Sequence, residues 1–268
     1  MSQEHAAPAV SLVMPCYNEA ECLRQTAGEL LSVFAVAQVP FQLVLVDNGS
    51  RDATGEIIDE LIKAGQPVTK VVVPANQGYG NGVLEGLRRC ETPFVGFLCA
   101  DGQVAADEAL EAYQLARNSA KPAMAKVRRR FRKDSWRRKL ISMVYNLGMQ
   151  LIFGWMGGID LNGNPKVLPR EVYQTMDLQS KDWFLDPEMM IKATYLGVRI
   201  LEFDVEGHAR RGGKSNVRFS TILNFIANVA RYRFGGALTE WKKSARREEW
   251  IRRASGAAST GAASGART

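Results

Sequence analysis

Segments typical of strands and segments typical of helices alternate four times within the first hundred residues, and this alternation constrains the fold more than any other feature. The strand-like segments are short, apolar and rich in β-branched residues, and they span residues 10–15, 42–47, 71–73 and 94–98. Between them, apolar residues recur at helical spacing. The pattern predicts an α/β fold with a doubly wound, mostly parallel sheet. Ligands of such sheets bind beyond the carboxyl ends of the strands, where the polar clusters of this chain fall.

The remainder of the chain divides by composition. Residues 9–216 are expected to form the main domain, after a short tail at 1–8 that lacks the basic start and apolar run of a signal peptide. Residues 217–253 predict amphipathic helices, with Trp241 and Trp250 interleaved among basic residues as at a membrane interface, although a solvated helix fits equally well. Residues 254–268 are rich in Gly, Ala, Ser and Thr and are expected to be disordered.

Positive charge is concentrated in one segment. Residues 126–139 contain nine Lys or Arg and one Asp, whereas the whole chain has a net charge of +7. A local basic patch implies an anionic partner: nucleic acid, anionic lipid or a substrate phosphate. Nucleic acid is the least expected, because the patch adjoins an apolar stretch and no groove-reading motif is present.

That apolar stretch, residues 140–159, has no formal charge over a length that could cross a bilayer. Asn146, Gln150 and four glycines within it favour an amphipathic helix on the membrane surface over a transmembrane helix. We therefore expect residues 126–160 to be membrane-proximal and the protein to be cytosolic, attached peripherally. The four cysteines lack zinc-site spacing and are expected to be reduced.

Polar clusters follow the first two strands. Each alone could only cap the next helix, but together they offer donors and acceptors for a base and a ribose. Asn76 and the glycines after it begin the third helix, where backbone amides favour a phosphate, unless this is an ordinary strand-to-helix turn. The predicted nucleotide-binding residues are Pro15, Tyr17, Asn18, Glu19, Asp47, Gly49, Asn76, Gly80 and Asp101.

The loop after the fourth strand predicts a metal site. Asp101 lies on a tight loop at the carboxyl edge of the sheet, and Gln103 can add an amide oxygen. Such oxygen ligands suit Mg²⁺ or Mn²⁺ held against a diphosphate. Because a single carboxylate provides few of the ligands that such a cation needs, the phosphates of the nucleotide are expected to provide the others.

The order of these clusters, from Val10 to Ser215, resembles family 2 glycosyltransferases, and most closely the dolichyl-phosphate mannosyltransferase and polyprenyl-phosphate glycosyltransferase branch. The resemblance implies a GT-A fold in which Pro15, Tyr17, Glu19 and Asp47 hold the nucleoside. It also implies a metal on Asp101 and Gln103. Cys99 stands where the family usually has another Asp, which puts the metal affinity in question.

The same resemblance implies acceptor-side and catalytic residues. Arg128 matches an arginine that faces the acceptor phosphate, and Arg138 lies in the segment that matches the membrane-proximal part of the family. Asp186 and Glu188 are similar to a carboxylate cluster near the sugar, where Asp186 could instead cap a helix. Arg210 matches a loop that closes over the diphosphate.

The resemblance implies an inverting enzyme that moves a sugar from a nucleoside-diphosphate sugar to a polyprenyl phosphate at the cytosolic membrane face. A phosphate acceptor is already ionised near neutral pH, so this reaction needs no strong base. The nearest alternative is a hydroxyl acceptor, with Asp186 or Glu188 as general base. A non-catalytic nucleotide-sugar or lipid-surface binding protein is a further alternative. The donor base, the sugar, the lipid and the oligomeric state are left open by the sequence.

Overall fold

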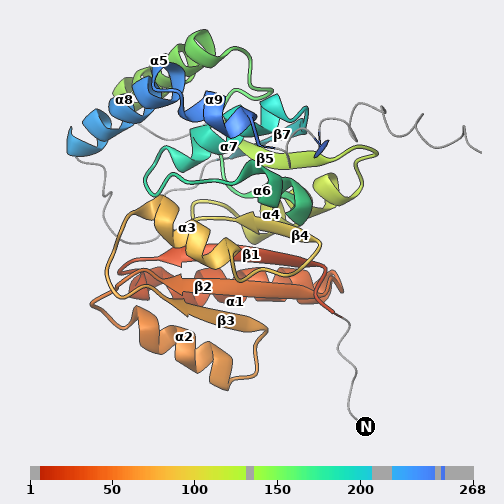
Figure 1. Ribbon diagram of the computed structural model, residues 1–268. Helices are drawn as coiled ribbons and strands as arrows, with labels where there is room; N and C mark the ends of the chain where they lie inside the picture. The colour runs from red at the N-terminus through yellow and green to blue at the C-terminus, as the bar shows by residue number, and fades with distance from the viewer. Residues whose placement is uncertain (1–6, 131–135, 207–218, 245–248, 251–268) are drawn as a thin grey trace, which may run out of the picture.

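The computed structural model describes residues 7–130, 136–206, 219–244 and 249–250. Within these ranges the chain forms one seven-stranded sheet with the strand order β3-β2-β1-β4-β6-β5-β7 (Figure 1). Only β6 is antiparallel to its neighbours, β4 and β5, and the other strand pairs are parallel. The strands are β1 (Val10–Cys16), β2 (Phe41–Asp47), β3 (Val68–Val72), β4 (Phe94–Phe97), β5 (Ala123–Arg130), β6 (Lys166–Pro169) and β7 (Arg199–Glu206).

Helices cover both faces of this sheet. The described helices are α1 (Ala20–Val36), α2 (Thr54–Lys63), α3 (Tyr79–Leu87), α4 (Ala106–Arg117), α5 (Trp136–Phe153), α6 (Arg170–Met176), α7 (Leu185–Tyr195), α8 (Phe219–Phe234) and α9 (Ala237–Lys242). One apolar core joins α1, α2 and α4 to the sheet, and the other joins α3, α6 and α7. In β1, Leu12 faces the first core and Val13 the second, as expected for a strand buried on both sides.

The predicted α/β fold with a mostly parallel sheet is confirmed, including the strands near residues 10–15, 42–47 and 94–98. The third strand begins at Val68, earlier than predicted, because its residues at the sheet edge are only half-buried and lack a long apolar run. Part of the basic segment forms β5, which the sequence did not predict. Its cations pair with acidic residues of β7 and of the loop before β6, and so they enter a sheet that otherwise buries apolar residues.

The uncharged stretch at 140–159 is not one continuous helix. Helix α5 ends at Phe153, and Gly154 follows with a φ of 85°, a left-handed conformation that commonly ends helices. Residues 154–165 then form turns that lead into β6. Within the described ranges, none of the helices combines the length and the apolar character needed to cross a membrane.

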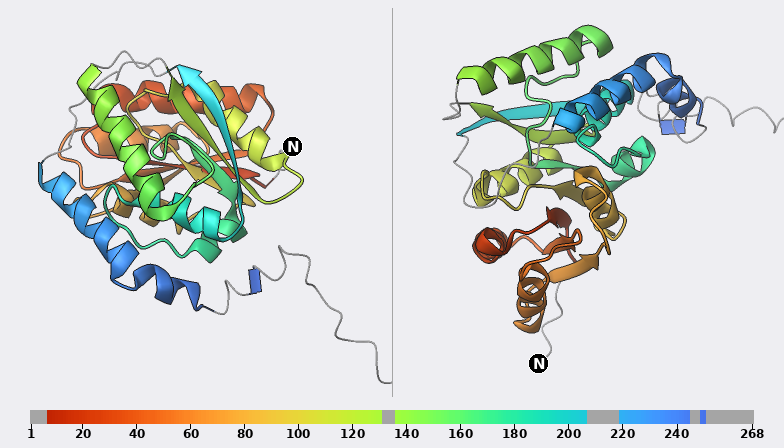
Figure 2. Two further views of the ribbon diagram at one scale, coloured as in Figure 1. Left: turned by 90° about the horizontal axis from the view of Figure 1, so that it is seen from above. Right: turned by 90° about the vertical axis from the view of Figure 1, so that its left-hand side faces the viewer.

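The two tryptophans near the C-terminus lie inside the protein, so the prediction that they mark a membrane interface was wrong. The indole N–H of Trp241 donates to the Met176 carbonyl at 2.6 Å, and that of Trp250 donates to the Leu196 carbonyl at 3.2 Å. Both rings are buried in the same core as α7. Helices α8 and α9 therefore pack onto the sheet domain, and Figure 2 shows α8 beside α5 at one end of the molecule.

Candidate functional site

The loops after β1 and β2 are held together by hydrogen bonds at the carboxyl edge of the sheet. The Asn18 side chain accepts from the Arg51 amide at 2.8 Å, and the Asn18 amide donates to Ser50 Oγ at 3.2 Å. The Glu19 amide donates to Thr54 Oγ1 at 3.0 Å. Asn18 thus joins the two polar clusters.

This joining places Pro15, Tyr17, Glu19 and Asp47 on adjacent strand ends, each partly exposed. One oxygen of the Asp47 carboxylate accepts from the Ser50 amide at 2.9 Å. Gly49, with a φ of 77°, brings the loop close to the segment after β3, because an added Cβ would lie 2.7 Å from the Asn76 nitrogen. The structure therefore brings together most of the predicted nucleotide-binding residues.

Gly80, at the start of α3, packs closely against the 180–183 loop. An added Cβ at Gly80 would lie 2.4 Å from the Ser180 carbonyl oxygen, and the Asn81 amide donates to the Lys181 carbonyl at 2.8 Å. The glycine therefore allows the backbone of the 180–183 loop to approach α3, and its predicted contact with the nucleotide stays a prediction. Asn76 stays exposed nearby and accepts from the Gly78 amide at 2.8 Å.

Asp101 lies just beyond β4, almost fully buried, and its carboxylate accepts from the Gln103 amide at 3.1 Å. Among the described residues, no three His, Cys, Asp or Glu side chains gather as a metal site would require. Asp101 and Gln103 still supply oxygen atoms of the kind that Mg²⁺ and Mn²⁺ prefer. They fit such a cation when a diphosphate supplies further ligands.

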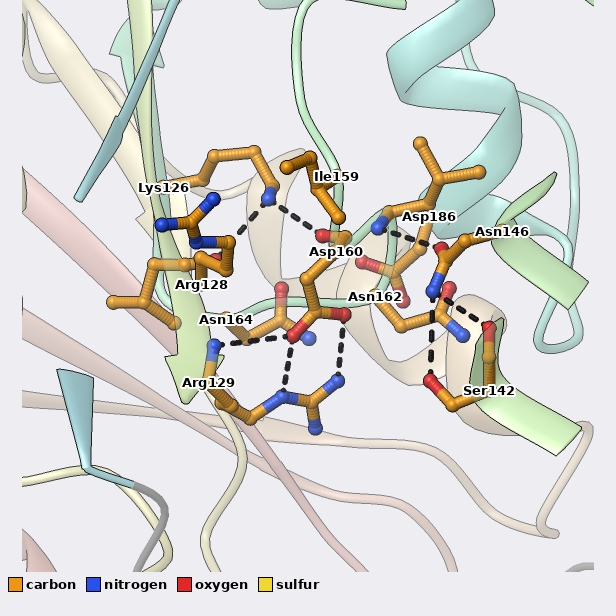
Figure 3. Close-up of polar contacts among 12 residues, drawn as sticks. Lys126, Arg128, Arg129, Ser142, Asn146, Ile159, Asp160, Asn162, Asn164 and Asp186 are labelled. Carbon is orange, nitrogen blue, oxygen red and sulfur yellow. Dashed lines mark hydrogen bonds and ion pairs between the residues drawn. The ribbon is translucent and has the colours of Figure 1, made fainter. Parts of the chain in front are cut away.

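A second polar cluster surrounds the loop at residues 158–164, between β5, α5 and α7 (Figure 3). The buried Lys126 ammonium donates to Glu202 at 2.6 Å and to the Asp160 carbonyl at 2.5 Å. Glu202 also accepts from the amides of Ile159 and Asp160. Burial and the neighbouring Lys166 charge lower the pKa of Lys126, although Glu202 acts in the opposite direction. Lys126 and Glu202 thus fix the start of the loop.

Arg129, three residues after Lys126 on β5, continues this cluster. Its guanidinium binds both oxygens of Asp160, at 2.8 and 3.0 Å, as Figure 3 shows. Burial alone would raise the pKa of Asp160, but the Arg129 charge and hydrogen bonds hold that pKa well below its usual value. Arg129 also interacts electrostatically with Cys99 and Asp186. Among the arginines of β5, Arg129 is the one that binds Asp160.

Arg128 lies on the opposite face of β5, because successive strand residues point to opposite sides. It binds the Asp204 carboxylate of β7 with two nitrogens, and Arg130 binds the same carboxylate at 2.8 Å. Arg128 therefore pairs with Asp204 and Arg129 with Asp160. The sequence missed Arg129 because three consecutive arginines give no sign of which one faces the site.

Asp186 lies at the start of α7 and pairs with Lys166, and both side chains are almost fully buried. Lys166 also donates to Asn164 at 3.2 Å, and Asn164 donates to the Tyr79 hydroxyl at 3.1 Å. Burial and the Asp186 charge raise the pKa of Tyr79. The Tyr79 ring stacks on Trp183, with 4.6 Å between ring centroids. Asp186 is therefore part of a buried polar network rather than exposed at the site.

Glu188 is fully buried, and both of its oxygens are occupied. It accepts from Lys192 and the Tyr232 hydroxyl, each at 2.5 Å, and from the Ser180 amide at 2.7 Å. Burial alone would raise the pKa of Glu188, but the Lys192 charge and these hydrogen bonds lower it. The structure therefore does not place Glu188 at the strand ends with Asp101. It joins α7 to α8 and fixes the 179–180 backbone.

Two of the predicted residues cannot be placed. The Arg138 side chain and the whole of Arg210 lie outside the described residues, so both stay predictions.

Comparisons with known proteins agree with this geometry. The family "Glycosyl transferase family 2" matches residues 11–173. A dolichyl-phosphate beta-glucosyltransferase, ALG5A, from Trichomonas vaginalis is 24% identical over 254 residues, covering 89% of this chain and 77% of the relative. An undecaprenyl-phosphate 4-deoxy-4-formamido-L-arabinose transferase from Proteus mirabilis is 26% identical, covering 82% of this chain. The chain spans 66% of that second relative.

Among solved structures, glucosyl-3-phosphoglycerate synthase from Mycobacterium tuberculosis superposes with a TM-score of 0.67 at 16% identity, covering 84% of this chain and 80% of that one. The same synthase in complex with Mn²⁺, uridine-diphosphate and glucosyl-3-phosphoglycerate gives a TM-score of 0.62 at 17% identity, covering 87% of this chain and 79% of that one. At this identity the similarity establishes the fold alone.

Proposed function

The chain belongs to glycosyl transferase family 2, and from this premise we propose that it transfers a sugar from a nucleoside-diphosphate sugar to a polyprenyl phosphate. The proposal rests on the surroundings of Asp186 and Glu188, the two candidate general bases. Asp186 and Glu188 are both held in buried ion pairs, and the pKa of Glu188 is lowered. A lysine ammonium group already occupies each of these buried carboxylates, so the arrangement favours an acceptor that needs no deprotonation.

On the donor side, the clusters after β1 and β2 bind the nucleoside. Pro15 and Tyr17 form one side of this site, and the Asp47 carboxylate accepts a hydrogen bond from the nucleoside. Asp101 and Gln103 would hold Mg²⁺ or Mn²⁺, and such a cation would supply positive charge to the diphosphate of the donor. Arg210 is proposed to add a further positive charge to the same group.

On the acceptor side, the phosphate is the nucleophile. Its second pKa is about 6, so it is largely dianionic at neutral pH. One of its oxygens forms a bond to the anomeric carbon while the bond from that carbon to the donor diphosphate breaks. A single displacement of this kind inverts the configuration at that carbon.

Arginines at the end of β5 position the acceptor. Arg129 is the best placed of them, because Asp160 orients its guanidinium, which also interacts electrostatically with Cys99 and Asp186. Its planar guanidinium can bind a phosphate with two hydrogen bonds, as it binds the two carboxylate oxygens of Asp160. Arg128 and Arg138 are proposed to contribute positive charge at longer range.

The place of the reaction is proposed to be the cytosolic face of a membrane. The net positive charge of residues 126–139 and the uncharged stretch after them support this location. Two relatives are named for dolichyl-phosphate or undecaprenyl-phosphate substrates, which also supports it. Attachment is proposed to be peripheral, through surface residues and the lipid substrate.

The test is the release of nucleoside diphosphate from a panel of nucleotide sugars, with and without Mg²⁺ or Mn²⁺ and with and without a short polyprenyl phosphate. Release that needs both the metal and the lipid phosphate is the expected result, and it also identifies the donor. Release with soluble hydroxyl acceptors in place of the lipid would instead assign the chain a hydroxyl acceptor. A complete lack of release from every donor would favour a binding protein.

A further inference from the structure

The outer face of α5 is apolar from residue 142 onwards, where its side chains are described. Met143, Leu147 and Leu151 follow one another at intervals of four residues and are 61%, 57% and 79% exposed. Four residues further on, Trp155 is 63% exposed and continues the row beyond the end of the helix. The other exposed side chains of α5 are also apolar, namely Val144 and Ile152. We call these six residues the α5 apolar face.

Such a face is unusual for a surface helix of a soluble monomer, whose solvent side normally carries charged residues. Helices α1 and α2 show the usual pattern, since exposed Arg24 pairs with exposed Glu60 across their outer sides. Residues 142–159 contain no charged side chain at all. The α5 apolar face therefore requires a partner that excludes water.

Charge near this face indicates what the partner is. In the segment directly before it, residues 126–139, the four basic residues of β5 pair with acids, and positions 131–139 hold five further Lys or Arg and one Asp. Arg231 and Arg233 are exposed on α8, which contacts α5 through the Phe225 and Tyr145 rings at 5.2 Å. Figure 2 shows both helices at the end of the molecule away from α2. Apolar residues that include Trp, flanked by Lys and Arg, are typical of helices that bind anionic lipid surfaces. A second copy would bring two identical positive surfaces together and would be repelled.

The inner face of the same helix carries polar side chains among its core residues, and these hold the 158–162 loop. Asn146 accepts from the Leu161 amide at 3.1 Å, and Tyr145 donates to Asn162 at 3.1 Å. Gln150 donates to the Gly158 carbonyl at 3.2 Å. Asp160, the partner of Arg129, lies between these anchor points. One helix thus connects an exposed apolar surface to the loop that faces Arg129.

We propose that the α5 apolar face rests in the interfacial layer of an anionic lipid bilayer, and that this contact steadies the 158–162 loop through Asn146. The lipid surface then acts as a structural part of the acceptor side of the site. The inference rests on the proposed function only in taking the region around Arg129 as the acceptor side of the site. The binding and the steadying of the loop are properties of the protein without donor or acceptor.

The first test is flotation with vesicles of phosphatidylcholine, with and without phosphatidylglycerol, for the wild type and for the double variant Leu147→Ser/Leu151→Ser. The wild type is expected to float with the anionic vesicles. The variant is expected to bind at least about tenfold more weakly, because two apolar side chains no longer enter the interface. The matched control, Val36→Ser/Ile62→Ser, removes exposed apolar residues of α1 and α2 and is expected to bind like the wild type.

Equal binding by the wild type and the Leu147/Leu151 variant, or no binding by either, would overturn the surface assignment. Analytical ultracentrifugation tests whether a second copy of the chain covers the α5 apolar face. A wild-type dimer that the same variant dissociates would assign the α5 apolar face to a second copy instead.

The second test is hydrogen exchange of the peptide that contains the Leu161 amide. Vesicles are expected to slow its exchange in the wild type. In Asn146→Ala, which keeps the α5 apolar face, vesicles are expected to bind equally but to leave exchange at Leu161 unchanged. Slowing in both proteins, or in neither, would overturn the link through Asn146. Both tests omit donor and acceptor, so a failure of sugar transfer in the separate release assay would refute the proposed function and leave these results intact.

Discussion

Replacing Asp186 by Asn removes one charge from a buried ion pair and leaves the side-chain volume almost unchanged. Lys166 is 0% exposed and Asp186 is 2% exposed, so the variant leaves an uncompensated ammonium inside the protein. Breaking a buried ion pair by removing one partner costs about 3–5 kcal/mol. Since domains are typically stable by only about 5–15 kcal/mol, this loss is large. We expect the free energy of unfolding of Asp186→Asn to fall by about that amount.

The assay is urea unfolding followed by circular dichroism, with turnover measured at a temperature where the variant is still folded. The double variant Lys166→Met/Asp186→Leu removes both charges, and it is expected to recover much of the lost stability. Turnover of folded Asp186→Asn is expected to fall by less than about tenfold, whereas the loss of a general base would slow it by about 10²–10⁴. Unchanged stability combined with the larger loss of turnover would refute the structural role of Asp186.

Three further predictions test other parts of the structure. Gly80→Ala should destabilise the protein by about 1–3 kcal/mol in urea unfolding, because the new Cβ meets the Ser180 carbonyl oxygen. In the control variant Gly28→Ala, the new Cβ has no neighbouring atom within 4 Å, so this variant should stabilise the protein by about 0.5–1 kcal/mol. Asp160→Asn should weaken the loss of stability at acid pH when the free energy of unfolding is plotted against pH. The pKa of Asp160 in the folded protein lies below the unfolded value of 3.8. The stability that the Asp160 carboxylate contributes is therefore present above pH 3.8 and is lost as the pH falls through the folded pKa. Cys99→Asp should lower the Mg²⁺ concentration needed for half-maximal turnover by about tenfold, because a second carboxylate adds an oxygen ligand and a charge; an unchanged metal requirement would show that residue 99 does not reach the cation.

The strand-end clusters could be predicted because their position follows from the strand pattern alone. Asp47 and Asp101 come directly after apolar runs, and parallel strands place their carboxyl ends on one edge of the sheet. The role of the α3 glycines could not be predicted in the same way. A glycine at a helix start shows that something approaches closely, but the sequence does not say whether it is a phosphate or, as at Gly80, the carbonyl of Ser180.

The acceptor side was harder to predict, because charged residues there pair across distant elements. In a run of arginines, a shift of one residue exchanges the two faces of a strand, so Arg128 and Arg129 were indistinguishable until the strand register was known. The ion pair of Lys166 with Asp186 joins two elements whose contact the sequence does not reveal. Similarly, Trp241 resembled an interfacial residue because its neighbours are basic, yet its ring packs into the core.

The most direct test of the account compares two acceptors that differ only in the phosphate. The wild-type protein is incubated with its donor, the metal and either a short polyprenyl phosphate or the matching polyprenol, and the lipid products are identified by mass spectrometry. We predict a glycosyl phosphate from the polyprenyl phosphate, with inverted anomeric configuration, and no product from the polyprenol. Glycosylation of the polyprenol at a comparable rate would contradict the account, because it would require a general base that the paired Asp186 and Glu188 do not provide.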